Sequence, residues 1–232
     1  MKHTTSSFPV FRRRGMAGLC VIIAITAVWP YLAFDPERFN PATKRFALEP
    51  PFRQAALYLH AVCGGLSLLI GPFQFFEGLR HRHPRLHRIC GQVYLAGVAV
   101  GAVSAFVIAP GMISGVTGEV GLILLGILWL WTAWQGIASA IHGRIGEHQA
   151  WMFRNFSLTF AAVTLRLWLL LLLLLLWPLL GSRYGGNFSR MFVDAYGVVM
   201  WLSWVPNIVL AEWMLRRQGK RMGTFVRSAQ EN

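Results

Sequence analysis

Charged residues are scarce in this chain of 232 residues. Asp, Glu, Lys and Arg make up 13% of the sequence, against 55% for hydrophobic residues. A soluble domain carries roughly a quarter charged residues, so this chain has too few to cover itself with a water-facing surface. Its apolar residues come in blocks near or above the ~20 residues needed to cross a bilayer. The composition excludes an ordinary soluble domain and predicts an all-α, polytopic membrane protein.

Cysteine and acidic residues are also few. Cys20, Cys63 and Cys90 lie in or at the edge of apolar segments, a pattern that makes no disulfide framework. Asp and Glu number 9 against 22 Lys and Arg, for a net charge of +13. On a soluble protein this excess would suggest nucleic acid. Here the positive charges flank apolar blocks, where they contact anionic headgroups, so we expect a lipid bilayer as partner and no nucleic acid.

Six apolar segments predict six membrane-spanning helices in a single bundle, one domain over residues 1–232. The first helix follows a basic N-terminus, as in a signal peptide, but no A-x-A-type cleavage site comes after it, so we expect it to be retained. The segment 35–53 contains four prolines, which predicts an extended loop or a surface-lying segment. The expected helices cover about 16–34, 54–76, 89–109, 118–141, 151–180 and 192–215.

The positive charges are unequally divided between the two sides of this arrangement. Six spans put both termini on one side, and that side carries 15 Lys and Arg residues against 6 on the other. Cytoplasmic loops of membrane proteins carry the excess of Lys and Arg. We therefore expect both termini in the cytoplasm.

The remaining positive charge, Arg166, lies inside the fifth expected helix. Counted from Arg154 at ~1.5 Å per residue, it is ~18 Å into the membrane. An arginine at that depth costs at least ~2.5–3.5 kcal/mol on insertion scales, so it should face the bundle interior. Two kinds of partner fit. One is an interhelical salt bridge or a clamp of carbonyls, and the other is an anionic ligand such as a propionate, a phospholipid headgroup or a quinone oxygen.

Arg166 shares one stripe of its helix with other polar or small residues. His148 precedes it by eighteen residues, which is five turns at 3.6 residues per turn, and Asn155, Thr159 and Ala162 fall between them on the same stripe. The other faces carry Phe, Leu, Val and Trp. The stripe fits the wall of an internal cavity, and it equally fits a hydrogen-bonded seam between helices.

Three histidines are candidate ligands. His87 and His148 each stand just before an apolar helix on the same predicted side, so the two rings could face each other as axial ligands of one haem. His60 lies about two turns into the second helix, near the other side, with Gly64 one turn further. A neutral histidine there is either a ligand for haem or a transition metal or a hydrogen-bonded core residue. His81 lies between arginines in the loop that precedes His87, where it should contact headgroups or water.

Two His-x-x-Cys pairs, His60 with Cys63 and His87 with Cys90, have the spacing of a soft-metal site on a helix. Each pair supplies only two ligands, so neither predicts a metal by itself. The sequence contains no nucleophile elbow, phosphate loop or HExxH motif. No catalytic residue is predicted.

Several motifs, in their order along the chain, resemble the bacterial membrane proteins grouped under domain of unknown function 2306 (DUF2306). The likeness covers roughly residues 54–180 and implies a helical inner-membrane protein without established activity. It selects His60, His87, His148, Arg154 and Arg166. The motifs are His60-x3-Gly64, Gly71-Pro72-Phe73-Gln74-Phe75, Arg80, Leu86-His87-Arg88 with Gly91 and Tyr94, His148-x-x-Trp151-Met152-x-Arg154, and Ala161-Ala162-Val163-Thr164-Leu165-Arg166.

These observations leave three hypotheses for function. The first is a haem- or quinone-linked redox or respiratory-maturation protein, with haem b, a quinone or a lipid in a buried site lined by His87, His148 and Arg166. At the level of fold only, it is similar to cytochrome b561-type and oxidase-maturation proteins. The second is a cofactor-free structural subunit or assembly factor, in a respiratory complex or a homo-oligomer. A transporter comes third, because coupled carriers place carboxylates near the midplane and this chain has none there.

Overall fold

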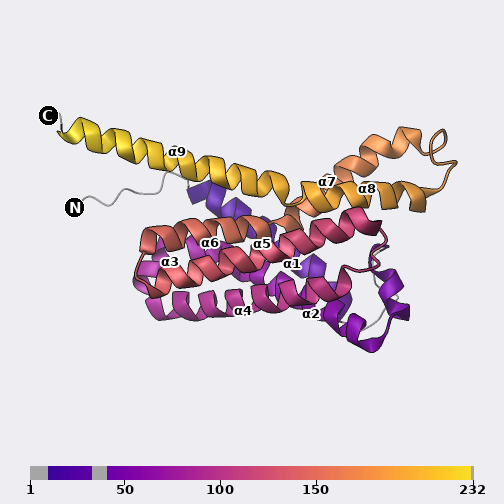
Figure 1. The fold of residues 1–232 in the computed structure, drawn as a ribbon, viewed down its shortest axis with the longest axis horizontal. Coiled ribbons are helices and arrows are strands. Elements are labelled where there is room, and N and C mark those ends of the chain that lie inside the picture. Colours follow the sequence, from indigo (N-terminus) through magenta and orange to yellow (C-terminus); the bar gives the residue numbers. More distant parts are fainter. Residues whose placement is uncertain (1–9, 33–40, 231–232) are drawn as a thin grey trace. The chain divides into compact units, whose positions relative to one another are not determined.

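The structure, a computed structural model, describes the backbone of residues 10–32 and 41–230 and the side chains of residues 15–32 and 41–218. Every regular element in these residues is a helix (Figure 1). The expected all-α architecture with six spans is confirmed, although residues 33–34 of the first expected helix lie outside the described residues. The segments long and apolar enough to cross a membrane are Gly15–Leu32, Pro51–Phe75, Pro84–Ile108, Gly115–Ile141, Ile145–Leu179 and Phe188–Gln218.

The chain divides into two compact units, unit 1 (Met1–Ser104) and unit 2 (Ala105–Asn232). The division falls near the end of helix α4 (Pro84–Ile108). That the two units act together as one bundle stays a prediction.

Unit 1 begins with α1 (Val10–Leu32), which packs against α2 (Pro51–Ile70). The contact is close at Gly65, where an added Cβ would lie 2.2 Å from a methyl of Val28. Glycine is therefore required there for the two helices to approach.

The second span does not continue as a regular α-helix to residue 76. It ends in a 3-10 helix, η3 (Gly71–Phe75), followed by the short α3 (Glu77–Arg82) and then α4. Pro72 accounts for the change, because proline has no N–H for the α-helical ladder and its ring crowds the carbonyl four residues before it.

The segment before α2 folds into a short 3-10 helix, η2 (Lys44–Leu48). Its Phe46 ring is 2% exposed and lies between two guanidinium groups, with the Arg45 and Arg53 centres 5.7 and 5.4 Å from the ring centroid. Burial of the ring and the cation–π contacts order residues 41–50 against the start of α2. Residues 35–40 of the expected loop lie outside the described residues.

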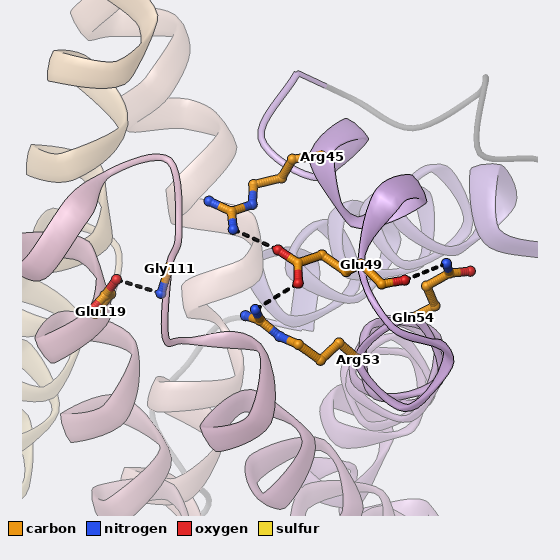
Figure 2. Close-up of polar contacts among 6 residues, drawn as sticks. All are labelled: Arg45, Glu49, Arg53, Gln54, Gly111 and Glu119. Atoms are coloured by element: carbon orange, nitrogen blue, oxygen red, sulfur yellow. Dashed lines mark hydrogen bonds and ion pairs between the residues drawn. The ribbon is translucent and has the colours of Figure 1, made fainter.

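Glu49 connects the two arginines beside Phe46. Its carboxylate accepts from Arg45 Nη2 at 2.7 Å and from Arg53 Nη1 at 2.9 Å, and its carbonyl accepts from Gln54 Nε2 at 2.8 Å (Figure 2). The hydrogen bond from Arg45, together with the charges of both arginines, lowers the pKa of Glu49 below its ordinary value. The folded segment therefore favours the ionised form of this carboxylate.

Unit 2 contains α5 (Gly115–Ile141), and a tight turn precedes this helix. Gly111 and Gly115 have positive φ angles of 76° and 62°, which side-chain-bearing residues rarely adopt. The Glu119 carboxylate accepts from the Gly111 N–H at 2.6 Å and so closes the turn (Figure 2). This turn joins the third and fourth spans.

The two last spans are each interrupted, where the sequence predicts continuous helices. The fifth span consists of α6 (Ile145–Thr159) and α7 (Ala161–Leu176), with a further 3-10 turn, η4 (Trp177–Leu179), at its end. The sixth consists of α8 (Phe188–Leu202) and α9 (Val205–Gln230). Figure 1 shows α9 running on as one long helix to the last described residues.

One asparagine contacts both interruptions. Asn207 Nδ2 donates to the Ser157 carbonyl at 3.2 Å and to the Ser203 carbonyl at 2.8 Å, and it lies 3.0 Å from Thr164 Oγ1. In an unbroken fifth helix the Ser157 carbonyl would accept from the N–H of residue 161. In the sixth span, Pro206 cannot donate to the ladder. The two breaks are therefore linked and stabilised by side chains.

The long leucine run of α7 is exposed along one side. Its exposed members cover Leu167 to Leu175, at 52–67% exposure. Exposure of leucine side chains to water is unfavourable, whereas the lipid tails of a bilayer are as apolar as leucine. This face of α7 is suited to lipid.

Candidate functional site

The predicted polar stripe of the fifth span packs against α5. The ring nitrogen Nδ1 of His148 lies 2.8 Å from the Gly136 carbonyl. Further along, Asn155 is fully buried, and its Nδ2 donates to the Trp129 carbonyl and to Thr132 Oγ1, both at 2.8 Å. The stripe residues therefore bond across an interhelical interface.

Thr159 completes this interface one turn further on. Its hydroxyl accepts from Trp129 Nε1 at 2.9 Å and donates to the Asn155 carbonyl at 3.1 Å. Of the two readings that the stripe allows, the structure favours the hydrogen-bonded seam between α5 and α6 over an open cavity.

A second seam joins α2 and α4 in unit 1. His60 Nδ1 lies 2.9 Å from the Gly101 carbonyl, and Ser67 Oγ lies 3.1 Å from the Tyr94 carbonyl. Between these contacts the backbones approach at Gly97, where an added Cβ would lie 2.9 Å from the Cys63 carbonyl oxygen. Small residues and interhelical hydrogen bonds of this kind are typical of packed membrane helices.

The carbonyl partners fix the tautomer of both histidines. A carbonyl oxygen can only accept a hydrogen bond, so Nδ1 of His60 and of His148 must carry the hydrogen. In the neutral ring Nε2 then has the free lone pair. Histidines that bind a metal or a haem iron are held in the same way, through a second-shell bond from the other ring nitrogen. The two rings are thus oriented with Nε2 as the available ligand atom.

His87 is half-buried in the first turn of α4. It belongs to unit 1 and His148 to unit 2. Their pairing across one haem therefore stays a prediction.

Arg154 binds a carboxylate within unit 2. Both of its guanidinium contacts go to Glu212 on α9, one from Nε and one from Nη2 at 3.2 Å. The guanidinium also lies over the Trp151 ring, 4.6 Å from the centroid. This bidentate pair ties α6 to α9 and neutralises the arginine, and a further role of Arg154 toward a ligand stays a prediction.

Arg166 extends back along its own helix, and its Nη1 donates to the Ala162 carbonyl. Ala162 is in the first turn of α7, just after the break at Phe160. This contact lies within α7 and joins no second helix, so the expected interhelical partner of Arg166 stays a prediction. An additional anionic ligand stays a prediction.

The three cysteines are free thiols, Cys20 buried and the other two half-buried. Within the described residues, no three His, Cys, Asp or Glu side chains gather closely enough to hold one metal ion. The pairs His60 with Cys63 and His87 with Cys90 therefore gain no third ligand from that part of the chain.

Sequence reasoning missed the partners that hold the site residues. The partners on α5 are spaced three and four residues apart, at Trp129, Thr132 and Gly136. A polar residue and a small residue four apart in an apolar helix, here Thr132 and Gly136, are typical of helix packing in membranes, and this pattern was visible in the sequence. For the breaks, the signal was Pro206 followed by Asn207 within an otherwise apolar span.

The six apolar spans and the two buried polar seams define a polytopic helical membrane protein. A family model described as predicted membrane protein (DUF2306) matches residues 57–215, and the chain belongs to this family. The match extends beyond residue 180 and includes most of the sixth span. No curated protein and no solved structure matches the chain.

Proposed function

We propose that this multi-pass membrane protein binds haem b and serves in respiratory redox chemistry, as an electron carrier or a maturation factor. The observation that carries the proposal is the fixed tautomer of His148. Its Nδ1 is held 2.8 Å from the Gly136 carbonyl, which leaves Nε2 as the ligand atom. His60 has the same arrangement with the Gly101 carbonyl.

His87 is the proposed second axial ligand, since the charge pattern puts it on the same side of the membrane as His148. Arg166 lies eighteen residues after His148, ~27 Å in a continuous helix, so it is the proposed partner for an anionic or carbonyl oxygen of a separate ligand, a quinone or a lipid. His60, near the opposite side, is the candidate ligand for a second cofactor.

The family and the charge pattern also support a location. We propose the bacterial inner membrane, with both termini in the cytoplasm and with a respiratory complex or a second copy of the chain as partner. The excess of Lys and Arg on the side of the termini supports this orientation.

The second candidate is a cofactor-free structural subunit or assembly factor. The seam favours it, because His148, Asn155 and Thr159 all bond residues of α5. In that case the histidines only lock the packing of the helices.

An absorption spectrum separates the two functions. Protein purified in mild detergent should show a Soret band that shifts on addition of dithionite, with about one haem per chain or more. A folded, colourless preparation that takes up no added haem would exclude the haem proposal and favour the structural one. A quinone would then be sought by extraction and mass spectrometry.

A further inference from the structure

A cluster of arginines lies at the junction of two candidate membrane spans in unit 1. Residues 76–83 separate two spans, Pro51–Phe75 and Pro84–Ile108, so they lie at the edge of the bilayer. Arg82 in this connection, and Arg85 and Arg88 in the first turns of α4, are all exposed. Within the described part of the chain, no carboxylate comes within salt-bridge distance of these three.

A second basic loop shows the contrast. Arg144, after α5, is similarly exposed, but its Nε lies 3.2 Å from the Glu147 carboxylate. Its charge is thus matched within the chain. The α3–α4 cluster (Arg82, Arg85 and Arg88) has no such match among the described residues, so its charge is open to an external anion.

The α3–α4 cluster surrounds a recess of about 360 Å³. The recess is lined by Arg82, His83, Pro84, Arg85 and Leu86. The residues from Pro84 on also form the first turn of α4. Pro84 has no N–H and the His87 N–H donates to the His83 carbonyl at 3.0 Å, which leaves the N–H groups of Arg85 and Leu86 at the positive end of the helix. Arg82, Arg85 and the start of α4 therefore border a space large enough for a phosphate group.

An apolar face continues from this recess along α4. Its exposed members, at 38–57% exposure, are three, four, seven and three residues apart, which places them on one side of the helix. Such a face beside a basic recess suits a ligand with an anionic head and a hydrocarbon chain. The face consists of Leu86, Ile89, Val93, Val100 and Val103.

We propose that this is a binding site for an anionic phospholipid. The phosphate lies between Arg82 and Arg85, and one acyl chain runs along Leu86, Ile89 and Val93. The apolar face favours a lipid over free phosphate, because a phosphate ion has no apolar part that could contact this face. The lining of the recess includes none of the residues proposed to hold haem, although His87 directly follows Leu86.

The test is native mass spectrometry of the full chain in detergent, titrated with phosphatidylglycerol and with phosphatidylcholine. We expect phosphatidylglycerol to bind more tightly. Loss of each arginine should weaken that binding about fivefold, since a basic residue near an anionic surface contributes about 1 kcal/mol. Arg82→Gln/Arg85→Gln should therefore lose roughly 25-fold, and Arg82→Lys/Arg85→Lys should retain most of the affinity.

Arg144→Gln is the matched control, because it removes an exposed arginine that is already paired. It should leave phosphatidylglycerol binding nearly unchanged. Equal affinity for the two lipids, or an equal loss in Arg144→Gln and in the double glutamine variant, would overturn the proposal. Displacement of the lipid by inorganic phosphate at equal concentration would overturn the assignment to a lipid.

Discussion

His60 and His148 each donate to a backbone carbonyl on a neighbouring helix, whereas the ring of His142 lies 2.7 Å from Ala138, a carbonyl of its own helix. Only an interhelical bond holds a ring relative to a second element. The first two rings are therefore restrained by tertiary packing, and His142, which is exposed, is not. His142→Ala can therefore serve as a control for His148→Ala.

The fully buried Asn155 tests the seam at the level of one residue. Asn155→Ala should destabilise the protein by about 1–3 kcal/mol, because the Trp129 carbonyl and Thr132 hydroxyl lose a buried donor. In a double-mutant cycle with Thr132→Ala, the coupling should be about 0.6 kcal/mol and no more than ~1.7 kcal/mol, the range for hydrogen bonds between membrane helices. Unfolding in detergent measures both quantities. Strictly additive effects of the two substitutions would contradict the hydrogen bond.

Glu49 makes the order of residues 41–50 depend on pH. Its pKa is lowered in the folded protein, so the ionised form is the one that the fold stabilises. The contribution to stability is present above the ordinary pKa of 4.5 and is lost as the pH falls through the lower folded-state value. Proteolysis within residues 41–50 should therefore increase at acidic pH. Glu49→Gln should be cleaved readily at neutral pH already, and a wild-type pattern in that variant would refute the role of the carboxylate.

At this scale the sequence identified the polar side chains within the spans, but not what they contact. Asn155 and Thr159 are buried, whereas His60, His148 and Arg166 are half-buried. The bonds of His60, His148 and Arg166 all go to backbone carbonyls. Every residue has a carbonyl, so residue identity carries no signal for such partners.

The helices pack through glycines as well as through hydrogen bonds, and Gly97 on α4 provides the test at the scale of elements. Gly97→Ala would place a Cβ 2.4 Å from Ser67 Oγ and 2.9 Å from the Cys63 carbonyl, so α2 and α4 must separate. We expect a loss of about 1–3 kcal/mol, typical of overpacking. Thermal unfolding in detergent is the measurement.

Gly64→Ala is the control for Gly97→Ala. Nothing lies within 4 Å of a Cβ at Gly64, and alanine favours the helix by up to about 1 kcal/mol relative to glycine. This variant should be as stable as the wild type or more so. If both variants lost the same stability, close packing at Gly97 would not be the cause.

The existence and order of the spans were predictable because runs of apolar residues are a direct consequence of bilayer thickness. The interruptions at Phe160 and at Ser203–Trp204 were not predicted. Apolar content is uniform across the break at Phe160, and its compensating donor, Asn207, comes from a different span. At the second break Pro206 and Asn207 were visible in the sequence, but their effect on the helix was not predicted. Tertiary hydrogen bonds of this kind do not appear in hydropathy.

For the whole molecule, the six spans require both termini on one side of the membrane, and the charge pattern predicts the cytoplasmic side. A reporter that is active only in the cytoplasm should work when fused after Asn232 and after Arg82, and should fail when fused after Arg183. Activity of the Arg183 fusion together with silence of the other two would contradict the orientation.

The haem proposal is tested most directly by comparing His148→Ala with His142→Ala. Both histidines lie at the α5–α6 connection, but only His148 bonds another helix. The measurement is the amount of haem per folded chain, from the Soret absorbance of each purified variant. We expect His142→Ala to keep the wild-type haem content and His148→Ala to lose at least one haem per chain. Equal haem content in the two variants, or none in the wild type, would contradict His148 as a haem ligand.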